Sequence, residues 1–304
     1  MSGTGTVAAS GSVMSLLDGD ECFEDCFFSL FLDCTKLTTA PELPATTLAN
    51  SCYNYMFCMC SSLTSAPVLP STTLAYGCYM NLFKGCTALS DAPELPATTM
   101  YRLCYTQMFL DCTHLTTPPA LPAMKMAEEC YSAMFSRSGL VTAPALPATE
   151  LADSCYSSMF SYCASLTRME GSLPAPIAKE YCYGDMFRNC SRLTQAPDIE
   201  AATLERNACC SMFLRCTSLT QAPRIEATTM GEESCFAMFR ACTGLTQVPD
   251  LKATTVGPRA CCTMFSGCPS LEVLPELPAT VLAEECYFEM FSYCTFSSWV
   301  FCSS

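Results

Sequence analysis

The sequence is poor in the residues on which most enzyme and metal sites depend. Its 304 residues include one histidine and one tryptophan, and charged residues make up only 14%, against the share of about 25% that is usual in soluble domains. No G-x-x-x-x-G-K-[ST] or G-x-G-x-x-G segment is present, so no phosphate-binding loop is indicated. A serine or cysteine nucleophile could be activated only by His114, which has no recurrent acidic or nucleophilic partner. We therefore expect a non-enzyme without a cofactor.

Basic surface, an export signal and a membrane span are missing as well. The formal net charge of -14 argues against a nucleic-acid partner, because such binding needs a basic surface. The first twenty residues lack the basic region and unbroken apolar run of a secretory signal. No apolar run approaches the roughly 18 residues of a membrane span. We expect no nucleic-acid partner and no membrane insertion, and the many thiols indicate folding in a reducing cytosol.

What the sequence has in abundance is one repeated unit. A Met-Phe or Leu-Phe step recurs eleven times, spaced 26 residues apart except for one spacing of 25 and one of 27. Around this step the unit reads C-T-x-L-T-x-A-P-x-L-P-A-T-T-L-A-x-x-C-Y-x-x-M-F-x-x-C. A single unit of this length cannot bury its own apolar side chains, so the units are expected to stack around one continuous core. The sequence therefore predicts a solenoid of eleven units.

The second half of each unit has the spacing of an amphipathic helix. In residues 47–60 the recurring positions have offsets of 0, 4, 5, 8, 9 and 12, which fall on one helix face. The Thr pair ahead of them can cap a helix, and Thr229 followed by Glu232 matches a capping box. We predict one helix of about three turns per unit. The recurring positions are Leu48, Cys52, Tyr53, Met56, Phe57 and Cys60.

The first half of each unit predicts a short strand and a turn. In residues 37–43 the leucines at both ends should point inward, and the threonines between them suit a strand. Pro41 cannot donate to a sheet and stiffens the turn that follows. The predicted fold class is thus an α/β repeat solenoid, an arc of short parallel strands with one helix per unit. We expect three parts: an N-terminal strand cap (residues 1–21), the solenoid (residues 22–294) and a strand-like end (residues 295–304).

Most of the 26 cysteines belong to the repeat. Ten lie three residues after the Phe of a unit, and eight lie four residues before the Met or its Leu substitute. On a helix these two positions are roughly 12 Å apart, too far for a disulfide, whose Cα atoms lie within about 7 Å. Paired C-x-x-C knuckles at zinc spacing are missing. We expect buried free thiols, and metal binding is the less favoured alternative.

The unit resembles the BspA-like leucine-rich repeats of bacterial surface proteins. Residues 57–63 and 83–89 carry the resemblance, each with an aromatic Phe, a Cys that follows it and a Leu three residues after that Cys. The unit is somewhat longer than is usual in that family, and the L-x-x-L-x-L strand of cysteine-containing leucine-rich repeats is replaced by L-T-x-A-P-x-L. The resemblance covers residues 22–302 and implies an arc used for protein binding or adhesion, exposed on a cell or virion surface. It names no partner and transfers no functional residue.

Two hypotheses about function remain open, and the first is an interaction module. The residue after the first Pro of each unit varies in charge and size, and these residues would line one edge of the sheet face. There they could contact a protein partner, although simple solvation explains them equally well. The candidate partner-binding residues are Glu42, Val68, Glu94, Asp198, Arg224, Asp250 and Glu276.

The second hypothesis is a structural protein that assembles with itself. The chain ends in an apolar, strand-like segment with no polar helix after it, and an uncapped solenoid exposes its core at its ends. Head-to-tail contact would give open filaments, or rings if the curvature closes. The alternative, which we favour, is that this segment folds over the last unit as its cap. The candidate self-association residues are Phe296, Trp299, Val300 and Phe301.

Overall fold

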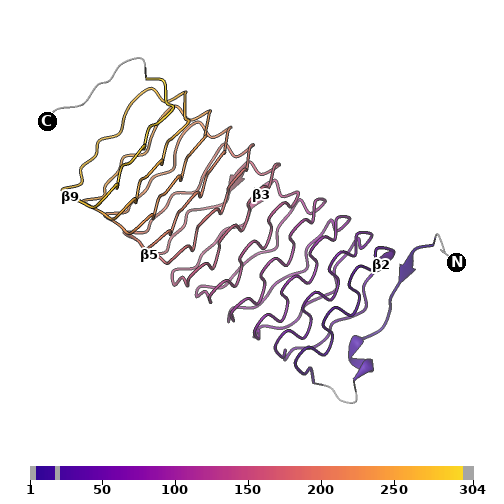
Figure 1. Cartoon of the computed structure of the whole chain (residues 1–304). Coiled ribbons are helices and arrows are strands. Elements are labelled where there is room, and N and C mark those ends of the chain that lie inside the picture. The colour runs from indigo at the N-terminus through magenta and orange to yellow at the C-terminus, as the bar shows by residue number, and fades with distance from the viewer. Residues whose placement is uncertain (1–4, 18–20, 297–304) are drawn as a thin grey trace.

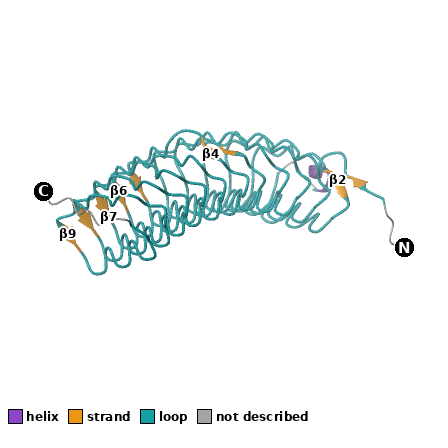
Figure 2. Cartoon of the chain, turned by 90° about the horizontal axis from the view of Figure 1, so that it is seen from above, coloured by secondary structure: helices purple, strands orange, loops and turns teal. Residues whose placement is uncertain are grey.

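The chain forms a solenoid in which each sequence unit makes one turn (Figure 1). The computed structural model describes residues 5–17 and 21–296, and within them the turns stack from the N-terminal end to the C-terminal end. Figure 2 shows that the stack is curved into an arc, with β4 (Arg168–Met169) near its crest. The expected division into three parts stays a prediction.

Short parallel strands join successive turns, as the sequence predicted, but the strands of the largest sheet lie at the Thr pair, where a helix was expected to start. β1 (Val7–Ala8) pairs with β2 (Leu37–Thr39), and β3 (Thr142–Ala143) pairs with β4. In other turns the strand is reduced to single bridges such as the one between Thr47 and Thr73. The largest sheet has five strands with a register of 26 residues, so equivalent positions of neighbouring units lie side by side. Its strands are β5 (Ile177–Ala178), β6 (Thr203–Leu204), β7 (Thr229–Met230), β8 (Thr255–Val256) and β9 (Val281–Leu282).

The predicted helix in each unit is wrong. The only helix in the described part of the chain is a short 3₁₀-helix, η1 (Val13–Leu16), in the N-terminal segment. Where helices were expected, the backbone makes a series of tight turns whose N–H groups alternate between two kinds of acceptor. The N–H of Met56 donates to the carbonyl of Tyr53, three residues back in its own turn, at 3.2 Å. The N–H of Phe57 donates at 3.0 Å to the carbonyl of Leu82 in the next turn of the solenoid.

These tight turns place a residue with positive φ at every fourth position. In one unit they are Ser51, Tyr55 and Met59, with φ between 51° and 62°. This conformation is unfavourable by roughly 1–2 kcal/mol for most L-residues, so it persists because the hydrogen bonds between turns and the core depend on it. Asp, Asn, Ser and Gly recur at the equivalent positions of other units, and Gly, Asn and Asp adopt this conformation most readily.

The second Thr of the pair lies in a strand or a bridge and does not cap a helix. Thr229 lies in β7 and pairs in register with Thr203 and Thr255. Glu232 is 3.6 Å from the guanidinium of Arg206 in the preceding turn, with which it forms an ion pair. The predicted capping box is therefore wrong, and its two residues connect neighbouring turns instead.

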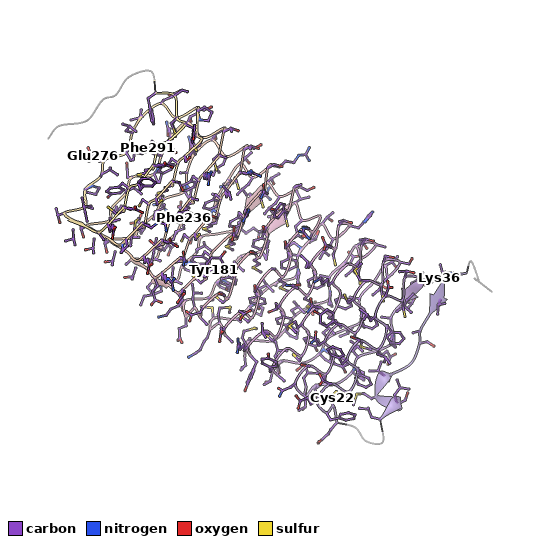
Figure 3. The ribbon with its side chains drawn as sticks, viewed as in Figure 1. Cys22, Lys36, Tyr181, Phe236, Glu276 and Phe291 are labelled. Atoms are coloured by element: carbon purple, nitrogen blue, oxygen red, sulfur yellow. The ribbon has the colours of Figure 1, made fainter. Side chains whose placement is uncertain are left out.

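The core consists of columns of identical side chains, which fill the inside of every turn (Figure 3). Phe57 and Phe83 are fully buried, and their rings stack with centroids 5.7 Å apart and an interplanar angle of 4°. The tyrosines form a second stack, in which Tyr53 and Tyr79 have centroids 5.8 Å apart. The predicted assignment of the Phe and Tyr positions to the core is confirmed.

The cysteine columns add hydrogen bonds between turns. The Sγ of Cys86 is fully buried and donates to the carbonyl oxygen of Phe57 in the preceding turn at 3.1 Å. The same contact recurs along the solenoid, for example from Cys216 to Phe187 at 3.1 Å. Burial raises the pKa of the Cys86 thiol, so that it stays protonated and able to donate. Every cysteine within residues 5–17 and 21–296 is a free thiol.

The unit that is one residue short is accommodated by a glycine. A Cβ on Gly139 would lie 2.3 Å from the carbonyl oxygen of Thr113, so no other residue fits there without a shift of the backbone. Ser138 occupies the position of the cysteine, and its Oγ lies 3.4 Å from the Sγ of Cys163 in the next turn. The interior contact between turns is thus kept across the irregular unit.

Candidate functional site

Two hollows lie along one edge of the solenoid, where the proline-containing segments of neighbouring units meet. We call this surface the proline edge and define it as residues 40–44, 67–70, 116–122 and 141–147. Proline has no N–H to donate, so the A-P-x-L-P segment cannot form a continuous ladder with its neighbours. The chain therefore runs here with few hydrogen bonds between turns, which leaves space between successive segments.

The larger hollow lies where the short unit meets its neighbours. Its volume is about 610 Å³, and its lining comes from residues 116–122, from residues 141–147 and from Glu170. Ala120 and Ala145 are exposed in its lining, whereas Leu121 is buried. Five prolines contribute to its walls, so the hollow is mostly apolar with one carboxylate. These prolines are Pro118, Pro119, Pro122, Pro144 and Pro147.

The second hollow has the same construction nearer the N-terminal end. Its volume is about 520 Å³. Val68 stands at this hollow with 79% of its surface exposed, while Leu43 in the same lining is only 2% exposed. Glu42 supplies the one charged side chain of the lining. An exposed valine beside prolines and a single carboxylate provides contact area for an apolar side chain with a basic neighbour.

The residues proposed from the sequence form one row across the turns, but their surroundings differ. Glu42 and Val68 both line the smaller hollow. Glu94 is exposed on the same row, and neither of the two hollows includes it. Asp250 and Glu276 are exposed further along the row, also outside both hollows. The structure thus brings two of the seven candidates together with the prolines of an apolar hollow.

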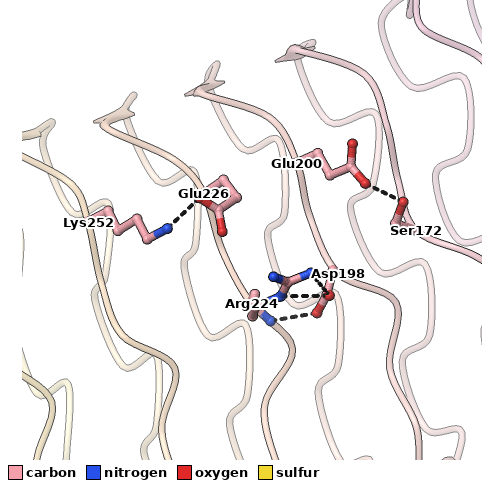
Figure 4. A network of polar contacts seen from close by, with 6 residues as sticks. All are labelled: Ser172, Asp198, Glu200, Arg224, Glu226 and Lys252. Carbon is pink, nitrogen blue, oxygen red and sulfur yellow. Dashed lines mark hydrogen bonds and ion pairs between the residues drawn. The ribbon is translucent and has the colours of Figure 1, made fainter.

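The remaining two candidates bind each other (Figure 4). The guanidinium of Arg224 lies 2.7 Å from Oδ2 of Asp198 through Nη2, and its Nε donates to the same oxygen at 2.9 Å. The backbone N–H of Arg224 donates to Oδ1 of Asp198 at 2.9 Å. Partial burial raises the pKa of Asp198, but the contacts with Arg224 outweigh it and hold the pKa below its usual value. This pair connects two turns, so these charges are already engaged.

The position of the second proline carries charge in this part of the chain. Glu200, Glu226 and Lys252 replace it in three successive units. Lys252 forms an ion pair with Glu226, and Ser172 donates a hydrogen bond to Glu200 (Figure 4). We call Asp198, Glu200, Arg224, Glu226 and Lys252 the charged edge. It occupies the same rows as the proline edge but is held together by polar contacts between turns.

The candidate self-association residues are described only in part. Phe296 is half-buried, and its ring meets that of Phe291 edge-on at a centroid distance of 5.8 Å. Trp299, Val300 and Phe301 lie outside the described residues. His114 is exposed, and its Nδ1 lies against the carbonyl oxygen of Thr87.

The described residues offer neither a cluster of metal ligands nor a membrane-spanning helix. Between residues 5–17 and 21–296, no three or more His, Cys, Asp or Glu side chains gather in a way that could hold a metal ion. No helix in this part of the chain has the length and apolar character needed to cross a membrane.

The sequence reasoning missed the hollows. It assigned Pro41 to the turn and Pro44 to the start of the predicted helix, where it would block extension backwards, and it did not consider that both prolines lie on one edge. The signal was the A-P-x-L-P spacing, which is present in the first units and loses its second proline from Glu200 to Lys252. A change from proline to charge at one position of a repeat indicates that the surface there changes character.

Comparison with known proteins finds two similar structures. No protein-family model matches the chain, and no curated protein matches it. A leucine-rich repeat protein from Bacteroides ovatus shares 15% identity, with 81% of this chain and 86% of that chain covered, at a TM-score of 0.29. A leucine-rich repeat protein from Eubacterium ventriosum shares 14% identity, with 99% and 93% covered, at a TM-score of 0.38. At TM-scores this low neither likeness carries an argument, and the fold described above rests on the hydrogen bonds of the chain itself.

Proposed function

We propose that the chain is a non-catalytic protein-binding module whose partner docks along the proline edge, in the manner of an adhesion or recognition repeat. The single observation that carries this proposal is the pair of hollows of about 610 and 520 Å³, built from equivalent segments of different units. Repetition at the 26-residue register presents both hollows on one edge, so that an elongated partner could occupy both.

The chemistry of the hollows favours a partner segment with apolar side chains and a basic residue. Proline walls and the exposed Val68 offer apolar contact without requiring backbone hydrogen bonds. Glu42 and Glu170 each add one carboxylate to a hollow. The net charge of -14 would additionally attract a basic partner at long range and increase its association rate. The charged edge is a weaker candidate because its side chains already bind one another.

The test is partner capture with matched variants of the full chain. Val68→Arg and Ala145→Arg place a large charged side chain in each hollow, at exposed positions where folding should be unaffected. Tyr101→Arg is the control, because Tyr101 is 54% exposed and lies outside both hollows. Proteins captured from the native source are identified, and the purified partner is then titrated against each variant.

We expect the partner to bind the wild type and Tyr101→Arg equally, and to bind each hollow variant at least tenfold more weakly, about 1.4 kcal/mol. Equal binding to all four proteins would remove the proline edge as the binding surface. A tenfold loss with Tyr101→Arg alone would also contradict the proposal, because it would place the partner on another face.

A further inference from the structure

On the tight-turn side of the solenoid, the backbone hydrogen bonds between turns run in one direction, from each turn to the next. In each interior turn, alternate N–H groups donate to carbonyls of the following turn. Between the last two turns these bonds measure 2.8–3.0 Å. The donors are Arg259, Cys261, Thr263, Phe265 and Gly267, and the acceptors are Glu284, Cys286, Phe288, Met290 and Ser292. One side of every turn therefore presents donors and the opposite side presents acceptors.

At the two ends of the described solenoid these rows have no partner within residues 5–17 and 21–296. In the last turn none of the equivalent N–H groups donates to a backbone carbonyl; they belong to Glu285, Tyr287, Glu289, Phe291 and Tyr293. In the first turn none of the equivalent carbonyls accepts a backbone hydrogen bond; they belong to Glu24, Cys26, Phe28, Leu30 and Leu32. Such unpaired rows are templates for pairing with another chain.

We propose that the last turn of one copy docks onto the first turn of a second copy and continues the solenoid across the junction. The donor row and the acceptor row each contain five groups at every second residue, so they match in register as interior turns do. The contact is heterologous, because it uses different surfaces of the two copies, and it leads to open end-to-end growth. It involves the ends of the stack and not the proline edge, so it is independent of the function proposed above.

The side chains at the two ends complement each other as the backbones do. Phe288 is 50% exposed and Phe28 is 47% exposed, and both occupy the same position of the unit. Docking in register would place one over the other. Phe291 would likewise lie over Phe31 of the second copy and extend the interior stack, in which Phe265 and Phe291 are 5.5 Å apart. The junction would therefore bury aromatic surface in addition to pairing the backbone groups.

Like charges at the junction oppose this contact, so its strength should depend on the salt concentration. Within the chain, Arg259 lies between Glu233 at 3.0 Å and Glu285 at 3.7 Å. Across the junction Glu285 would face Asp25 of the second copy, with no arginine between them. Glu284 would similarly face a glutamate, Glu24. Screening of these like charges should strengthen the association, so it should increase with ionic strength.

The test uses two variants of the full chain, each blocked at one end. Phe28→Lys places a charge at the acceptor end, and Phe288→Lys places one at the donor end. Each variant alone should stay a monomer of 33.0 kDa at concentrations where the wild type associates. Mixed together, they should form dimers that grow no further, because only one productive junction remains. Tyr101→Lys is the control, exposed to 54% but within the stack, and should associate like the wild type.

Sedimentation and small-angle scattering over a concentration series, in low and in high salt, give the readout. The expected result is particles that lengthen at constant cross-section, and a gain of about threefold to tenfold in association constant for Glu24→Lys. A wild type that stays monomeric in both salts would overturn the proposal, because the edge would then be covered within its own chain. Failure of the two blocked variants to pair, or an increase in cross-section, would overturn it as well.

Discussion

Replacing a central phenylalanine tests the stacked core most directly. Phe187 is fully buried, and its ring lies 5.4 Å from the rings of both Phe160 and Phe213. Phe187→Ala should cost about 3–5 kcal/mol through lost burial and the cavity left behind. Loss of two ring pairs, worth about 0.5–1.5 kcal/mol each, should place the total near the upper end of that range or above it.

The matched variant is Phe291→Ala at the end of the stack. Phe291 is only half-buried; its ring stacks on that of Phe265 at 5.5 Å and meets that of Phe296 edge-on at 5.8 Å, so its loss should cost about 1–3 kcal/mol. Urea unfolding gives the free energies, and amide hydrogen exchange shows whether the loss is confined to the affected turn and its neighbours, as a nearest-neighbour architecture requires. A small effect at Phe187, or equal effects at Phe187 and Phe291, would refute the stacked-column description of the core.

Three further predictions concern the backbone and the thiols. Ala241 has a φ of 58°, so Ala241→Gly should stabilise the chain by up to about 1 kcal/mol. Ala260→Gly, at a buried position without positive φ, should destabilise it by a similar amount. Thermal unfolding measures both changes, and a loss of stability in Ala241→Gly would contradict the turn geometry. A hydrogen bond with Cys52 lowers the pKa of the Cys22 thiol to about 6, so alkylation of Cys22 should rise between pH 5 and 7 and then level off; a rise only above pH 8 would contradict this. Cys112→Val removes the S–H donor to the carbonyl of an earlier turn and should cost about 1–2 kcal/mol in urea unfolding, while Cys112→Ser keeps a donor and should cost less.

The solenoid and its core columns could be predicted because the repeat is visible without any assumption about local structure. A Phe at the same place in eleven successive units must occupy equivalent surroundings, and an apolar residue repeated in this way belongs inside. The burial of Phe57 and Tyr53 therefore followed from the register alone. Secondary structure was not needed to reach it.

The tight turns could not be predicted correctly because their four-residue spacing resembles the spacing of apolar residues on one face of an α-helix. Leu48, Cys52, Met56 and Cys60 are spaced strictly by four, whereas an α-helix turns by 3.6 residues and so drifts by about 40° every four residues. Over three such steps the stripe would move by about 120°, onto the flank of a helix. A series of four-residue turns keeps these positions on one side. The recurrence of Asp, Asn, Ser and Gly at the same interval was the available signal, because a helix interior disfavours these residues.

The hollows could not be predicted because they depend on how far apart neighbouring proline segments lie. Sequence spacing shows that Pro41 and Pro44 are on one edge, but not that a space remains between their unit and the next. The larger hollow also lies at the short unit, where Gly139 lets the backbone approach Thr113. The depth of the hollows on this edge therefore depends on how neighbouring units pack against each other.

The two halves of the candidate edge show how one repeat can carry two kinds of surface. A proline cannot bind its equivalent in the next turn, so a row of prolines leaves its apolar faces unpaired and open to another molecule. A charged residue at the same position can form an ion pair with its equivalent in a neighbouring turn, as Lys252 does with Glu226. The charges of such a row are therefore already paired with one another. Reversal of Asp198 would therefore act first on its bond with Arg224 and only indirectly on a partner. Recognition is for this reason better sought where the unit keeps both prolines.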